Sequence, residues 1–145
     1  MGQVDFYQLS RDPVERVVPL LASKALDSGG RLVVVSASSE QRAALSQALW
    51  GREKAFLAHG EAGAPHADRQ PVLLAAVCSA PNAAPVVLIA DGLWREEAAS
   101  FERVILLFGA DQTGEARQLW TRLSGEGHAL RIFKQQDDGR WREGR

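Results

Sequence analysis

The sequence predicts an α/β layer fold built on a mostly parallel sheet. Its first half alternates between short β-branched runs and segments whose apolar residues recur every three or four positions, in the order strand, helix, strand, helix. The run Leu32–Val35 is apolar at every position, which is typical of a strand that is covered on both faces. Parallel neighbouring strands need a crossover connection, and the intervening helices supply it.

The first strand is expected at residues 4–9, where β-branched and aromatic residues mix. Asp12 is expected to cap the first helix, with Pro13 as its first residue. The apolar residues from position 14 to position 25 then fall on one helical face. Gly29 and Gly30 end this helix.

The second helix is expected to begin after Ser38, which stands three residues before Gln41 in a capping pattern, and to end near Trp50. Residues 60–70 are rich in Gly, Ala, Pro, His and Asp without periodicity, which indicates a surface loop rather than a domain boundary. We therefore expect one domain over residues 1–145.

The second half of the chain is expected to complete the same sheet. Further strands are predicted at residues 72–77, 86–90, 104–108 and 130–134, with the last helix at 114–123. The three runs before this helix, together with Leu32–Val35, lack alternation. They should therefore lie in one central sheet with helices on both faces. The chain end at residues 137–141 is expected to form a turn and a basic stub.

Composition limits the classes of function. The chain has 145 residues, 17 Lys and Arg against 18 Asp and Glu, and a net charge of −1, which argues against a protein that grips duplex DNA by its phosphates. Its apolar runs are too short to span a bilayer, and we expect no signal peptide and a cytoplasmic location. The single cysteine, Cys78, excludes an internal disulfide and is expected in the core.

The chemistry of common catalytic and cofactor sites is not evident in the sequence. After Val35 come Ser36, Ala37, Ser38 and Ser39, without the glycines that let backbone N–H groups converge on a phosphate. The glycines at 60 and 63 precede no helix with a lysine. The three histidines are too widely spaced for a metal motif. We therefore expect no enzyme, no cofactor and no metal.

Two regions stand out against this background. Trp50 ends a predicted helix and is followed by Phe56 and Leu57; by pattern alone this aromatic pair favours the core over a partner surface. Residues 117–145 carry seven basic and four acidic residues, and Arg117 and Trp120 share a helical face. Such a pair is common at interaction hot spots, and it also fits a solvated basic face with the tryptophan in the core.

In this order, the motifs resemble the chi subunit of bacterial DNA polymerase III, almost from end to end. The matching segments are Phe6-Tyr7-Gln8-Leu9, Ala48-Leu49-Trp50, Phe56-Leu57-Ala58-His59-Gly60, Pro71-Val72-Leu73-Leu74, Phe101-Glu102-Arg103-Val104, Arg117 with Trp120, Gly127, Lys134-Gln135 and Gly139-Arg140-Trp141. Each motif is short, and their common order makes the resemblance specific.

The resemblance implies a Rossmann-like three-layer sandwich with a mostly parallel central sheet and no nucleotide-binding loop. It also implies a non-catalytic adaptor of the replisome, which links the clamp loader to single-stranded DNA-binding protein. The adaptor captures that protein's acidic C-terminal tail, which ends in a Phe with the chain carboxylate. Contact with DNA would be mainly indirect, and a second partner would be the psi subunit or an equivalent clamp-loader protein.

The resemblance assigns residues to both partners. Arg117 matches the carboxylate-binding arginine and Trp120 the ring-packing aromatic, whereas Thr121 and Ser124 stand where many members have basic residues. Arg131 and Lys134 are expected to attract the acidic part of the tail in their place. Trp50, Phe56 and Leu57 match the surface for the second partner, which implies exposure rather than burial.

Two alternatives stay open at this point. One is a small α/β nucleotide-binding protein or enzyme with unrecognised loops. The other is a direct single-stranded DNA binder, which needs aromatic stacking platforms along one groove.

Overall fold

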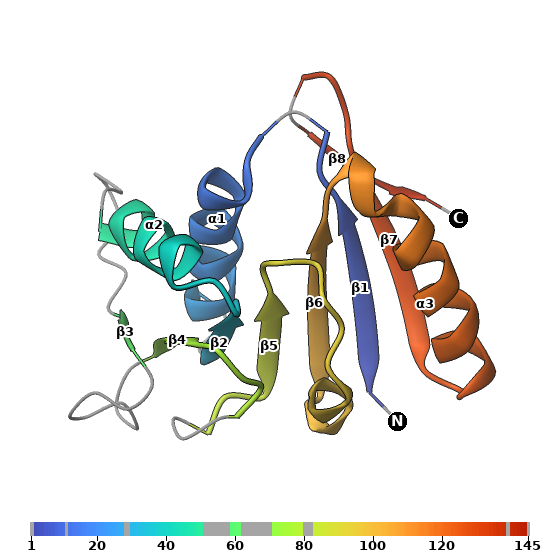
Figure 1. Ribbon diagram of the computed structural model, residues 1–145, viewed down its shortest axis with the longest axis horizontal. Coiled ribbons are helices and arrows are strands. Elements are labelled where there is room, and N and C mark those ends of the chain that lie inside the picture. The colour runs from blue at the N-terminus through green and yellow to red at the C-terminus, as the bar shows by residue number, and fades with distance from the viewer. Residues whose placement is uncertain are drawn as a thin grey trace.

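The structure is a computed structural model that describes residues 2–10, 12–27, 30–50, 59–61, 71–79, 83–138 and 140–144 (Figure 1). For residues 50 and 59–61 it describes the backbone only. The strands in this part of the chain are β1 (Gln3–Gln8), β2 (Leu32–Val35), β3 (His59–Glu61), β4 (Val72–Ala75), β5 (Val86–Ile89), β6 (Arg103–Phe108), β7 (Ala129–Gln135) and β8 (Trp141–Gly144). The helices are α1 (Val14–Asp27), α2 (Ser39–Trp50) and α3 (Thr113–Gly125), with short 3-10 helices η2 (Glu96–Ser100) and η3 (Ala110–Gln112).

The described strands form one eight-stranded sheet in the order β3-β4-β2-β5-β6-β1-β7-β8. All neighbours pair in parallel except β7 and β8, which are antiparallel. The prediction that the four unalternated runs share one central sheet is confirmed, since they form the adjacent strands β4, β2, β5 and β6.

Helices cover both faces of this sheet, which confirms the three-layer α/β prediction. One apolar cluster joins the strands to buried residues of α1 and α2, among them Val18 and Leu45. The other cluster, on the opposite face, contains Ala116 and Leu123 of α3 and Ala98 of η2. Figure 1 shows α1 and α2 beside one half of the sheet and α3 beside the other half. None of the helices in the described ranges has the length and apolar character that a membrane span needs.

Two strands were not predicted. β3 lies at the start of the expected loop at residues 60–70, whose remaining residues fall outside the described part of the chain. It has no β-branched residue, and its pairing with β4 rather than local propensity makes it a strand. The expected basic stub at the chain end is instead β8, which forms a hairpin with β7. This hairpin matters below because it borders the candidate site.

The predicted start of the second helix at Ser38 is confirmed, although the Gln41 side chain donates to the Ala90 carbonyl and does not complete a capping box. The backbone N–H of Gln41 donates to the Ser38 hydroxyl oxygen at 3.1 Å, and the N–H of Arg42 donates to the Ser38 carbonyl at 3.0 Å. Ser38 therefore occupies the N-cap, where its side chain satisfies one of the free N–H groups of the first turn.

Candidate functional site

A groove of about 500 Å³ lies between α3 and the strands β1 and β7. Apolar side chains of the strands form its floor, and polar and charged side chains stand along its rim. Its lining residues are Phe6, Gln8, Phe108, Thr113, Ala116, Arg117, Trp120, Thr121, Ile132 and Lys134. The groove therefore contains four of the residues that the sequence assigned to a partner tail: Arg117, Trp120, Thr121 and Lys134.

Trp120 forms an aromatic wall of the groove. Helical spacing turns Ala116 and Leu123 into the core beneath α3, where both are buried. Trp120 lies beside them and is only half-buried. Its ring meets the Phe6 ring edge-on, with the centroids 5.2 Å apart, and Phe6 in turn meets Phe108 edge-on at 6.3 Å. This packing holds the indole in place and leaves part of it accessible to an apolar ligand group.

Two cations stand at the rim of the groove. Arg117 is exposed on α3 and Lys134 is exposed near the end of β7. Within the described part of the chain, neither side chain forms an ion pair with a carboxylate. An aromatic wall beside uncompensated positive charge suits a ligand that is apolar at one point and anionic next to it.

The two positions at which the sequence departs from the resembling family contribute no charge to the groove. Thr121 lines it, but its hydroxyl donates to the Arg117 carbonyl at 3.1 Å, within the helix. Ser124 is exposed further along α3 and does not line the groove. Arg122, the next basic residue on the helix, points to the other flank, where its Nη2 lies 2.6 Å from the Glu96 carboxylate.

Arg131 is not brought to the groove, contrary to its grouping with Lys134 in the sequence. It lies on the opposite face of β7, where its Nε and Nη2 each donate to the fully buried Asp5 carboxylate at 3.0 Å. Arg103 donates to the same carboxylate at 2.7 Å. Burial alone would raise the pKa of Asp5, but the hydrogen bonds from Arg131, Gln3 and Arg103 outweigh it and hold this pKa below its usual range. The ionised Asp5 therefore keeps Arg131 away from α3.

The sequence also missed residues that shape the groove. Phe6 and Ile132 form its floor because alternate residues of β1 and β7 face α3. Arg142 stands directly opposite Lys134 in the β7–β8 register. A turn signal at Asp137-Asp138-Gly139 between two short runs could have indicated this hairpin.

A comparison with known families identifies the family of the chain. A family model described as DNA polymerase III chi subunit, HolC, matches residues 1–131. The chain belongs to this family. The chi family is a non-catalytic accessory subunit of DNA polymerase III, so the chain is assigned to DNA replication. None of the curated proteins compared matches the chain.

The second surface assigned by the chi resemblance lies outside the described side chains. α2 ends at Trp50, whose backbone is described and whose side chain is not, and Phe56 and Leu57 lie in the undescribed range 51–58. Their role toward a second partner stays a prediction.

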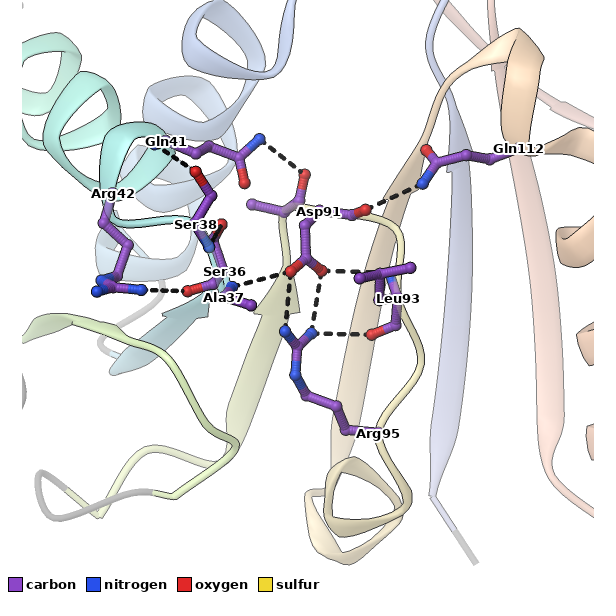
Figure 2. Close-up of polar contacts among 10 residues, drawn as sticks. Ser36, Ala37, Ser38, Gln41, Arg42, Asp91, Leu93, Arg95 and Gln112 are labelled. Carbon is purple, nitrogen blue, oxygen red and sulfur yellow. Dashed lines mark hydrogen bonds and ion pairs between the residues drawn. The ribbon is translucent and has the colours of Figure 1, made fainter.

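In this chi-family chain, side chains of the protein itself occupy the sheet edge at which nucleotide-binding α/β proteins hold their ligand. Beyond the ends of β2 and β5, the Asp91 carboxylate accepts the N–H groups of Ala37 at 2.9 Å and Leu93 at 3.2 Å (Figure 2). Arg95 donates to both carboxylate oxygens, at 2.8 and 3.0 Å. Burial would raise the pKa of Asp91, but these hydrogen bonds, led by those of Arg95, hold it below its usual range.

Further contacts close the same edge. Gln41 donates to the Ala90 carbonyl at 3.4 Å and Gln112 to the Asp91 carbonyl at 3.0 Å, so α2 and the segment before α3 both meet the end of β5 (Figure 2). Gly92 has φ +74°, and a Cβ there would lie 2.4 Å from the Gln112 amide nitrogen. The polar groups at the ends of β2 and β5 thus bind one another, which weighs against the alternative that a nucleotide binds there.

The described tryptophan side chains do not share a groove. Trp120 lines the groove beneath α3, Trp94 a groove on the other flank of that helix, and Trp141 a groove beside α1 on the far face of the sheet. A single-stranded DNA platform would need them along one path. Among the described residues, His, Cys, Asp and Glu form no group of three that could hold a metal ion.

Proposed function

We propose that this chi-family subunit links the clamp loader of DNA polymerase III to single-stranded DNA-binding protein by holding the acidic C-terminal tail of that protein in the groove beneath α3. One observation supports this proposal most directly. The half-buried Trp120 and the exposed Arg117 line the same groove, and Arg117 has no carboxylate partner among the described residues. The tail ends in an apolar ring and a carboxylate on one residue, and the two side chains complement these groups.

In this proposal the two sides of the groove bind different parts of the tail. The terminal Phe ring lies against Trp120 and the floor formed by Phe6 and Ile132, and its carboxylate binds the Arg117 guanidinium. Lys134, across the groove on β7, faces the acidic residues that precede the Phe. Each ligand group thus meets a side chain of matching chemistry.

A binding titration with two labelled peptides tests this function. One peptide has the acidic stretch and the final Phe, and the other lacks the Phe. We expect clear binding of the first and much weaker binding of the second, because only the first supplies the ring together with a correctly placed carboxylate. Equal binding of the two peptides would remove the tail from this groove.

We further propose that the end of α2 and the segment after it hold the psi subunit or an equivalent clamp-loader protein, through Trp50, Phe56 and Leu57. Support comes from the chi-family match over residues 1–131, which includes this segment. The complex would act in the cytoplasm, with DNA reached mainly through the bound partner. Copurification of the clamp loader with the wild type and with Trp50→Ala tests the assignment.

A further inference from the structure

We propose that the α3-facing side of the β7–β8 hairpin is a second, electrostatic part of the tail site, at which Lys134 and Arg142 bind the acidic residues upstream of the terminal Phe. This inference rests on the proposed function and adds a surface and a residue to it. Arg142 lies beyond residues 1–131, the range of the family match.

The register of the hairpin places the two cations side by side. Lys134 pairs with Arg142, and side chains of directly paired residues project from the same face of a sheet. Lys134 lines the groove beneath α3, so this face is the α3 side. The neighbouring Trp141 confirms the alternation, since its ring packs against Tyr7 on the far face with centroids 5.1 Å apart.

Gly144 leaves room for this arrangement. A Cβ built on Gly144 would lie 3.6 Å from the Lys134 Cε and 3.4 Å from the Ile132 Cγ2. The lysine side chain therefore leans across β8, over the glycine and beside Arg142. Together the two residues extend the positive rim of the groove from β7 to the edge of the sheet.

The acidic and basic side chains of β8 lie on different faces of the hairpin. The acidic Glu143 of β8 alternates to the far face, where Arg131 is paired with Asp5. Lys134 and Arg142 remain on the α3 side, and neither forms an ion pair within the described ranges. Outside the two strands, the closest acidic residues in sequence are Asp137 and Asp138 of the turn, and Asp138 accepts the Arg140 N–H at 3.0 Å. The charged residues on the α3 side of these two strands are thus both basic.

The direction of the bound tail follows from these positions. The terminal carboxylate is fixed at Arg117 on α3, and the helix offers no further cation facing the groove, because Thr121 and Ser124 are neutral and Arg122 pairs with Glu96. Among the described residues, Lys134 across the groove and Arg142 beside it are the cations that continue this face, so we place the preceding acidic residues along them.

The test combines variants of the protein with two labelled synthetic peptides. Both peptides end in Phe with a free carboxylate; one has Asp residues upstream and the other has Asn in their place. Arg142→Gln should weaken binding of the Asp peptide by about two- to fivefold, the range expected for one exposed ion pair. It should leave binding of the Asn peptide unchanged, and Arg142→Lys should restore most of the loss.

Arg140→Gln is the matched control. Arg140 lies in the same hairpin with a side chain that is 87% exposed, and its Nε lies 3.7 Å from the Asp138 carboxylate, so this cation has an acidic neighbour that Arg142 lacks among the described residues. The inference is overturned if Arg142→Gln has no effect, if it weakens both peptides equally, or if Arg140→Gln does the same. If Arg117→Ala leaves the binding of both peptides unchanged, the proposed tail site is wrong, and the proposed hairpin surface, which rests on it, is wrong as well. If Arg117→Ala weakens peptide binding and Arg142→Gln does not, the tail site stands and only its proposed extension onto the hairpin is rejected.

Discussion

Trp120 is half-buried against Phe6, whereas Arg117, three residues earlier on the same face of α3, is exposed. The tryptophan is fixed by the core that it touches, so a ligand ring meets a surface that is already ordered. The Arg117 guanidinium forms no ion pair with the described carboxylates, so Arg117 can bind an anionic ligand without breaking an ion pair to them. At the scale of single residues, these two differences explain why the groove suits an apolar group next to a carboxylate.

Arg117→Ala is expected to weaken binding of the tail peptide by about 1–3 kcal/mol, roughly five- to 150-fold in affinity, because the terminal carboxylate loses its charged donor. The free energy of unfolding should change little, since the side chain is exposed. Fluorescence anisotropy with the labelled peptide measures the loss. Arg122→Ala, on the same helix but paired with Glu96 on the other flank, is the control and should bind as the wild type does.

Asp5 predicts a dependence of stability on pH. Its pKa in the folded chain lies below its usual value of 3.8, so its contribution is fully present above that value and is lost as the pH falls through the folded-state pKa. Asp5→Asn should lower the free energy of unfolding by about 3 kcal/mol at pH 7, because Arg103 and Arg131 lose their shared carboxylate.

Urea titrations of both proteins at pH 7 and pH 3 check this behaviour. The difference between the wild type and Asp5→Asn should shrink at the lower pH. A difference that stays constant would show that the Asp5 charge does not stabilise the fold.

The positions of the charged residues show where sequence pattern ceases to be informative. A spacing of three places Arg117 and Trp120 on one face of a helix wherever that helix packs. On β7, Ile132 faces α3 and Phe133 faces the opposite side, and both are apolar. Because both faces of the strand are apolar, alternation does not identify the face that α3 covers, and a shift of one residue exchanges them. A spacing of three places Arg131 and Lys134 on opposite faces of β7, so alternation shows that they cannot share the groove but does not identify which of them faces it.

At the scale of elements, the cap of α2 is a local feature with a measurable contribution. Ser38→Ala removes the acceptor of the Gln41 N–H and should lower the free energy of unfolding by about 1 kcal/mol. Ser38→Asp should retain most of the stability, because a carboxylate can accept the same bond. Thermal or urea unfolding measures both. Loss of tail binding in Ser38→Ala would contradict the assignment, since α2 packs on the face opposite α3.

Elements with local signals were predictable, and elements that depend on partners were not. The strands β2, β4, β5 and β6 have apolar runs that only a buried sheet accommodates, and α2 has a capping residue at its start. β3 and β8 have three and four residues and no such run. Pairing with β4 and β7 defines them as strands. For β8 the turn at residues 137–139 was a local signal, but the residues after it lack the alternating apolar pattern of a strand, so the hairpin half of the candidate site was missed.

At the scale of the whole molecule, the end of α2 and the groove beneath α3 lie on different parts of the sheet. α2, which ends at Trp50, contacts β3 and β4, whereas the groove lies between α3, β1 and β7. Four strand spacings separate β4 from β1 in the sheet order, which corresponds to roughly 20 Å. The two helices also lie on opposite faces. If the second partner binds at the end of α2, as proposed, one chain can hold both partners at once.

This separation predicts that each partner can be lost independently. Trp50→Ala should weaken binding of the clamp-loader partner by about 2 kcal/mol or more, as truncation of an interface hot-spot aromatic does, and should leave the tail peptide affinity unchanged. Arg117→Ala should do the reverse. In a bridging assay, where tail peptide on beads captures the clamp loader only through this chain, either variant should abolish capture. If Trp50→Ala lowered tail affinity while its unfolding curve stayed that of the wild type, the two surfaces would be coupled and the adaptor arrangement would be wrong.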